Sequence, residues 1–142
     1  MPIYKINEEA NLNKNNKWTI KPLVSVGKIK FGMKREDVHK SFSEKYTEFK
    51  KSKSSKNLTD DYGNFHVYYD SDDKVEAVEI FEGIKVILND KTIFPINTKD
   101  IESTIPGIKN NRNNFIDRER SITIKTNSYS AECITIGCKG YF

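Results

Sequence analysis

Three stretches in which apolar and polar residues alternate around a polar turn constrain this chain more than any other feature. They cover residues 65–81, 84–94 and 121–136, and each joins two alternating segments through residues such as Asp, Asn and Ser. Alternation with a period of two buries one face of a β-strand and exposes the other. Asp, Asn and Ser favour turns because their side chains bond to the nearby backbone. The sequence therefore predicts three β-hairpins.

A longer period begins at Lys34 and marks the first predicted helix. Val38, Phe42 and Tyr46 follow one another at intervals of four residues, with charged side chains between them. This spacing places the three apolar side chains on one face of an amphipathic helix. We expect the helix to end in the Lys- and Ser-rich loop at residues 50–56.

A second, shorter helix is expected to run from about residue 98 to residue 104. Thr98 can cap its N-terminus, and Pro106 with Gly107 ends it. The Asn-rich segment that follows, residues 109–114, predicts a loop.

The same order of elements occurs twice along the chain. A strand, a helix, a polar loop and a hairpin occupy about residues 24–83, and the same series occupies about residues 84–142. Overlaying the two hairpins aligns Val78 with Ile134 without a gap. The match lies in apolar periodicity and in the order of the elements rather than in identity, and it predicts a tandem repeat.

The predicted fold is an α+β domain at residues 18–142, an antiparallel sheet with helices on one face, built from a tandem helix-plus-β-hairpin repeat. Residues 1–17 are rich in Asn, Lys and Glu and predict a flexible or loop-like arm. The length of 142 residues suits a single domain.

Composition excludes several classes of protein. No segment approaches the roughly 20 apolar residues of a membrane helix, and the first residues do not resemble a signal peptide. We therefore expect a cytoplasmic protein without a membrane partner. Cys133 and Cys138 are the only cysteines and predict reduced thiols, with too few ligands for structural zinc. No cofactor and no metal are expected.

Catalytic motifs are missing from the sequence. It contains no phosphate-binding loop, dinucleotide fingerprint, zinc-protease helix or nucleophile elbow. His39 and His66 have no evident partner in the sequence that would make either a general base. We expect no catalytic residues and a protein that is not an enzyme.

Acidic residues gather in and around the first hairpin, next to two tyrosines. Carboxylates and amphipathic rings of this kind suit a protein interface, and most turn carboxylates are simply solvated. The candidate binding residues are Asp60, Asp61, Tyr68, Tyr69, Asp70, Asp72, Asp73, Glu76, Glu79 and Glu82.

Residues 26–38, Val-Gly-Lys-Ile-Lys-Phe-Gly-Met-Lys-Arg-Glu-Asp-Val, resemble the strand, Gly-Met and helix opening of small bacterial immunity proteins of contact-dependent growth inhibition and polymorphic toxin systems. The resemblance continues through residues 67–70, 75–81 and 134–142. The Gly-Met opening is also similar to outer-membrane assembly lipoproteins of the SmpA/OmlA type and to β-lactamase-inhibitory proteins. This chain lacks the lipidated N-terminal Cys that the lipoproteins carry.

The resemblance implies a cytoplasmic antidote that binds one toxin domain, often a nuclease, and blocks its active site or its access to substrate. Immunity proteins against basic nucleases are commonly acidic, whereas this chain has a net charge of +4. Local charge on the acidic hairpin can still select a basic partner.

Two further hypotheses belong to other classes. The lysines of residues 50–56 could make the chain a nucleic-acid-binding module, although an RNA-binding arm more often adds Arg and aromatic residues, and we expect no nucleic-acid partner. A small hydrolase would use the Asp and Glu cluster together with His66.

Overall fold

The computed structural model describes residues 16–55 and 57–142. The predicted arm at residues 1–17 lies outside the described residues, apart from Asn16 and Lys17. Lys17 already begins the first strand, one residue before the predicted start at Trp18.

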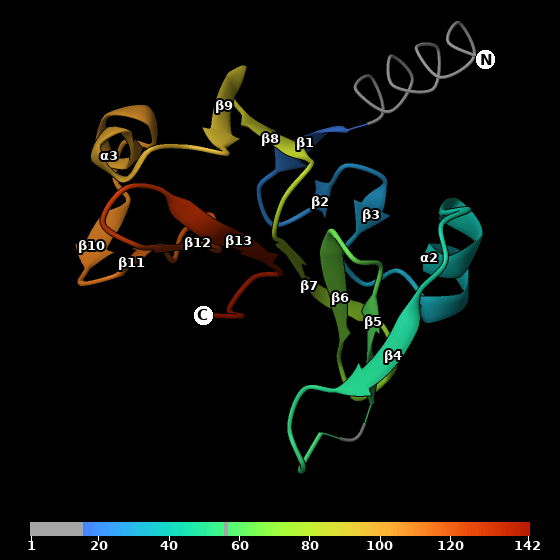
Figure 1. Ribbon diagram of the computed structural model, residues 1–142. Coiled ribbons are helices and arrows are strands. Elements are labelled where there is room, and N and C mark those ends of the chain that lie inside the picture. Colours follow the sequence, from blue (N-terminus) through green and yellow to red (C-terminus); the bar gives the residue numbers. More distant parts are fainter. Residues whose placement is uncertain (1–15, 56) are drawn as a thin grey trace, which may run out of the picture.

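One of the two sheets is small and contains the only parallel pair among the described strands (Figure 1). Its strands, in spatial order, are β3 (Ile29–Lys30), β2 (Ser25–Val26), β1 (Lys17–Lys21), β8 (Lys85–Leu88) and β9 (Lys91–Phe94). β1 and β8 run parallel, with Trp18 opposite Val86. This pairing joins the N-terminal strands to the second half of the chain, which the expectation of purely antiparallel pairing did not include.

The larger sheet is antiparallel throughout. Its strands, in spatial order, are β10 (Lys109–Asn111), β11 (Asn114–Asp117), β12 (Ile122–Thr126), β13 (Ala131–Gly137), β7 (Val75–Ile80), β6 (Phe65–Tyr69), β5 (Leu58–Asp61) and β4 (Thr47–Lys50). β7 and β13 lie side by side at its centre, with Ile80 opposite Ile134. Each half of the sheet is therefore a four-stranded meander.

The three predicted hairpins are confirmed. β6 pairs with β7, β8 with β9, and β12 with β13, each antiparallel. Each pair also contains one shift of register. The structure is mostly sheet, with 47 % strand and 11 % helix, so the α+β class holds loosely. A four-stranded meander of the larger sheet follows each helical segment, and the structure does not show the predicted helix-plus-hairpin repeat.

The first helix is shorter than predicted. α2 spans Arg35–Ser41, and Phe42 beyond it is extended, with φ −124° and ψ 129°. Residues 47–49, which the prediction included in the helix, and Lys50, which it placed in the loop, form β4 and pair with β5. Leaving the helix allows the Phe42 ring to pack 5.2 Å from that of Phe65 and the backbone of β4 to bond to the sheet.

The second helical segment lies where it was predicted, but its start differs. A 3₁₀ turn, η1 (Thr98–Asp100), leads into α3 (Ile101–Thr104). Thr98 does not cap the helix; its hydroxyl donates to the Asn127 carbonyl at 2.9 Å. The prediction of a loop at the Asn-rich residues 109–114 is also wrong, because residues 109–117 form the β10–β11 hairpin.

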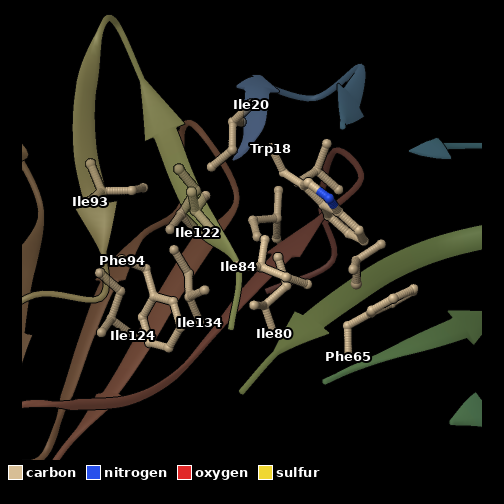
Figure 2. Packing of buried hydrophobic residues seen from close by; sticks show 14 of the residues in the cluster. Trp18, Ile20, Phe65, Ile80, Ile84, Ile93, Phe94, Ile122, Ile124 and Ile134 are labelled. Atoms are coloured by element: carbon tan, nitrogen blue, oxygen red, sulfur yellow. The ribbon is translucent and has the colours of Figure 1, made fainter. Parts of the chain in front are cut away.

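A single cluster of buried hydrophobic side chains contains residues from both sheets (Figure 2). Trp18 and Ile20 enter it from β1, and Phe65, Ile80 and Ile134 enter it from the larger sheet. Because one face of the larger sheet is covered in this way, the side chains that alternate with its core residues lie on the opposite, open face. Within the described residues, no helix is long and apolar enough to cross a membrane.

Candidate interaction surface

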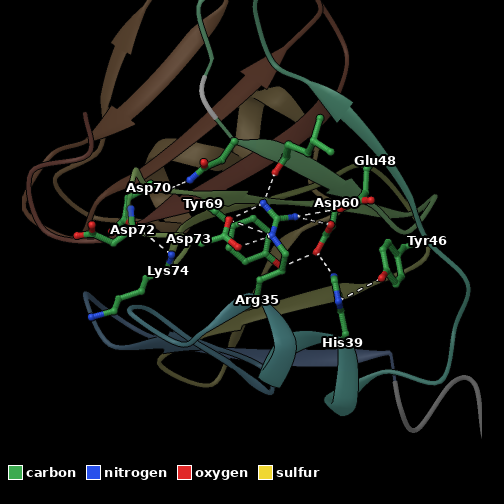
Figure 3. A network of polar contacts seen from close by, with 12 residues as sticks. Arg35, His39, Tyr46, Glu48, Asp60, Tyr69, Asp70, Asp72, Asp73 and Lys74 are labelled. Carbon is green, nitrogen blue, oxygen red and sulfur yellow. Dashed lines mark hydrogen bonds and ion pairs between the residues drawn. The ribbon is translucent and has the colours of Figure 1, made fainter.

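Arg35, in the first turn of α2, is the centre of a polar network that joins the helix to the larger sheet (Figure 3). Its Nε and Nη2 donate to the Asp73 carboxylate at 2.7–3.0 Å, and its Nη1 donates to Asp60 Oδ1 at 2.9 Å. Nη2 also donates to the Leu58 carbonyl at 2.7 Å. The guanidinium carbon lies 4.0 Å from the centroid of the Tyr69 ring. These contacts fix the guanidinium in one orientation.

Asp60 is fully buried and bonded on both oxygens. Besides Arg35, it accepts hydrogen bonds on Oδ2 from the Tyr69 hydroxyl at 2.5 Å and from His39 Nε2 at 2.7 Å. The other ring nitrogen of His39 faces the Tyr46 hydroxyl at 3.1 Å. A buried charge is tolerated only when it is paired and hydrogen-bonded, and these partners satisfy that need.

The network shifts the pKa values of two of its members. Hydrogen bonds from Arg35 lower the pKa of Asp73, against a smaller opposing effect of burial. Burial, reinforced by the hydrogen bond to Asp60, raises the pKa of Tyr69. Asp73 therefore stays ionised and Tyr69 stays protonated around neutral pH.

Three of the predicted binding residues are thus part of the contact between α2 and the larger sheet. Asp60 and Tyr69 are buried, and Asp73 is bound to Arg35. The prediction that they face a partner is wrong for Asp60 and Tyr69, because strand alternation turns them toward the helix. His39 lies between the Asp60 carboxylate and the Tyr46 hydroxyl, with one ring nitrogen within hydrogen-bond distance of each.

Tyr68 and Glu79 lie on the open face of the larger sheet, on neighbouring strands. The Tyr68 hydroxyl donates to Glu79. The Cys133 thiol and the Thr135 hydroxyl also lie 3.5 and 3.4 Å from Glu79 Oε2. Burial raises the pKa of Tyr68, and burial with Glu79 nearby raises the pKa of Cys133 to about 12. Cys133 is therefore an unreactive thiol, and Glu79 is the polar centre of this face.

Three aromatic rings, with His66 in the middle, pack together beside Tyr68 and Glu79. His66 meets Phe49 and Phe81 edge to face, with ring centroids 5.0 and 4.6 Å apart. Its Nε2 lies 3.3 Å from Asp61 Oδ1. All four side chains are partly exposed. We call Phe49, Asp61, His66, Tyr68, Glu79 and Phe81 the open-face cluster.

The remaining predicted residues are dispersed around this cluster. Asp70 accepts from the backbone N–H groups of Asp72 and Lys74 and so shapes the β6–β7 turn. Asp72 and Glu82 are exposed, and no hydrogen bond of either side chain is recorded within the described residues. Glu76 lines a cavity of about 210 Å³ together with Tyr68. The structure therefore brings Asp61, Tyr68, Glu76 and Glu79 to one face. Asp72 lies in the β6–β7 turn beside the start of α2, and Glu82 follows the end of β7.

Sequence reasoning missed the contacts of Arg35 and His39 and the place of Phe49 beside His66. Strand alternation places Phe81 on the same face as Glu79. Nothing in one sequence pairs Arg35 with carboxylates 25 and 38 residues away. Among residues 16–55 and 57–142, no three His, Cys, Asp or Glu side chains gather as a metal-binding group.

Comparisons with known proteins add no relative to this description. No family model matches the chain, and neither the curated proteins nor the solved structures contain a match.

Proposed function

We propose that this protein is an immunity protein that binds a bacterial toxin domain and neutralises it without catalysis, by covering its active site or its access to substrate. The surface that makes the contact is the open-face cluster with its acidic margins. Immunity by binding needs a complementary surface and no chemistry of its own.

The observation that carries the proposal is the combination of partly exposed aromatic rings and carboxylates on one face of the larger sheet. Phe49, His66 and Phe81 present rings that a partner can bury, and Asp61 and Glu79 lie beside them. Aromatic anchors at the centre of a patch contribute much of the binding energy in protein interfaces. Surrounding charges select the partner and accelerate encounter.

The net charge of +4 does not oppose a basic partner. Asp61, Glu76, Glu79 and Glu82 all belong to β5, β7 or the residue pair after β7. Fields fall off within about 10 Å at moderate salt, so these four carboxylates, together with Lys51 beside Tyr68, decide the local sign more than distant lysines do. A toxin domain with a basic active-site cleft, such as a nuclease, fits this charge.

We also propose that the two halves of the chain are divergent copies of one unit, which is the repeat predicted from the sequence. In support, each helical segment precedes a four-stranded meander. At the centre of the sheet Ile80 lies opposite Ile134, and Val78 lies opposite Ile136. The overlay that equates Val78 with Ile134 also equates Ile80 with Ile136. Applied to the two facing pairs, it converts the pair Ile80–Ile134 into the pair Ile136–Val78. A local two-fold relation between the two halves requires this exchange. The first copy binds, and the second completes the core.

The test is co-purification with the toxin domain encoded beside the gene, followed by protection of cells that express this toxin. Phe81→Ala and Glu82→Lys should weaken the complex, because they remove an anchor and reverse a marginal charge. Glu119→Lys is the matched control, since Glu119 is an exposed carboxylate in the turn after β11. A toxin that neither binds the wild-type protein nor is neutralised by it would refute the proposal.

A further inference from the structure

Lys51 places its ammonium group beside two tyrosine rings. Nζ lies 4.4 Å from the centroid of the Tyr68 ring and 5.3 Å from that of Tyr141. It also donates a hydrogen bond of 2.7 Å to the Tyr141 hydroxyl. A cation within about 6 Å of a ring centroid is attracted by the negative face of the ring. Tyr68 and Tyr141 therefore form an aromatic cage that holds a cation of the same chain.

The sheet fixes both walls of this cage. Tyr141 lies against Gly137 in β13, where an added Cβ would lie 2.7 Å from the Tyr141 Cβ. Its backbone N–H donates to the Cys138 carbonyl at 3.1 Å. Tyr68 is held by its hydroxyl, which donates to Glu79. The rings keep their positions through contacts that do not involve Lys51.

The occupant, in contrast, comes from an exposed segment. Lys51 follows β4, and the next residues bond among themselves, with the Ser52 hydroxyl 3.1 Å from that of Ser54 and 3.0 Å from that of Ser55. The recorded polar contact of the ammonium is the bond to Tyr141. Replacing Lys51 by another cation therefore breaks one hydrogen bond and leaves the cage intact.

The surroundings favour a positive charge. Glu76, Tyr68 and Lys51 line the cavity of about 210 Å³, together with Asp70. Burial raises the pKa of Glu76, while Lys51 acts in the opposite direction. A cation beside this carboxylate favours its ionised form. The cavity extends from the cage and gives room for an aliphatic stem.

We propose that Tyr68, Tyr141 and Glu76 form a recognition site for one aliphatic cation of a partner, a lysine or arginine side chain, and that Lys51 fills this site until the partner displaces it. That the cation comes from a toxin rests on the proposed function. The affinity of the cage for a cation does not.

The experiment measures the binding of butylguanidinium chloride and butylammonium chloride to the full chain by NMR of the assigned Tyr68 and Tyr141 ring signals. Sodium chloride at the same concentration controls for ionic strength. The variants are Lys51→Ala, which empties the cage, and Lys53→Ala, which removes a neighbouring exposed lysine. Lys51→Ala combined with Tyr141→Leu removes one wall, and its fold is checked by dispersion of the core methyl signals.

Saturable shifts of both rings should occur in Lys51→Ala at about tenfold lower probe concentration than in the wild type, if Lys51 fills the cage nine-tenths of the time. Lys53→Ala should match the wild type, and loss of the Tyr141 wall should abolish saturation. Equal response of the wild type and Lys51→Ala would overturn the proposal, as would shifts that sodium chloride reproduces.

The two proposals fail separately. If the probes bind the emptied cage but no toxin is neutralised, the cation site stands and the proposed function falls. If the toxin is neutralised but the probes do not bind, the proposed function stands and the cation site falls.

Discussion

Arg35 Nη1 donates to Asp60 Oδ1 at 2.9 Å and thereby ties the first turn of α2 to the interior of β5. The carboxylate is fully buried, and the side chain of Arg35 is 15 % exposed. A buried ion pair gives little net stability over an apolar contact, but losing one partner leaves the other charge without compensation. The pair therefore fixes the position of the helix on the sheet.

Asp60→Ala should lower the free energy of unfolding by about 3–5 kcal/mol, because it strands Arg35, His39 and the Tyr69 hydroxyl. Urea denaturation measures the change. Asp72→Ala is the control, since Asp72 is exposed, and it should change the free energy by less than about 0.5 kcal/mol. A loss below about 1 kcal/mol in Asp60→Ala would show that the network does not hold the helix.

Asp73→Asn should alter how stability depends on pH. The pKa of Asp73 in the folded protein lies below the ordinary value of 3.8, so its ionised form stabilises the fold above that pH. This contribution disappears as the pH falls through the depressed value. The melting temperatures of wild type and Asp73→Asn should differ by a constant amount above about pH 5. The difference should close below pH 3.8. A gap that does not narrow as the pH falls from about 5 to about 2 contradicts this account.

Ile136→Ala and Thr135→Ala distinguish the two faces of the larger sheet. Ile136 is fully buried opposite Val78, and Thr135 is half-buried on the open face. Truncating Ile136 should cost about 2–5 kcal/mol through lost burial and a cavity. Truncating Thr135 should cost about 1 kcal/mol or less. Denaturant titration of both variants checks the assignment, and equal losses would refute it.

Gly137→Ala should displace Tyr141, since the new Cβ would meet the Cβ of that residue at 2.7 Å. The expected loss is about 1–3 kcal/mol, as for other overpacked sites. Tyr141→Gly removes every Tyr141 atom that the new Cβ would meet, so the double variant should lose less than the sum of the single losses. Additive losses would show that the two residues do not press on one another.

The hairpins were predictable because strand alternation is a local signal. Phe42 and Tyr46 show where a local signal misleads: their spacing imitates a helix, yet Phe42 packs against Phe65, and the Tyr46 ring stacks 4.1 Å from that of His39. Residues in contact with a helix can keep its period after the helix has ended. The β10–β11 hairpin escaped prediction because Asn residues favour loops, and only pairing with β12 makes them strands.

The candidate site was predictable in part. Acidic clustering indicated the β6–β7 hairpin, and alternation could place Tyr68 and Glu79 on one face. The sequence could not show that the Asp60 carboxylate is paired with Arg35, since that contact joins residues 25 apart in sequence. The cage of Tyr68 and Tyr141 depends on a turn that returns the C-terminal residues to the sheet, which one sequence does not indicate.

The central claim is stoichiometric neutralisation through the open-face cluster. The most direct measurement titrates the activity of the purified toxin domain with the wild-type protein, Phe81→Ala, Glu82→Lys and Glu119→Lys. The account predicts inhibition that is complete near one molecule per toxin for the wild type and Glu119→Lys, and weakened by about tenfold or more for Phe81→Ala and Glu82→Lys. Inhibition at far below one molecule per toxin, or equal inhibition by all four proteins, would contradict it.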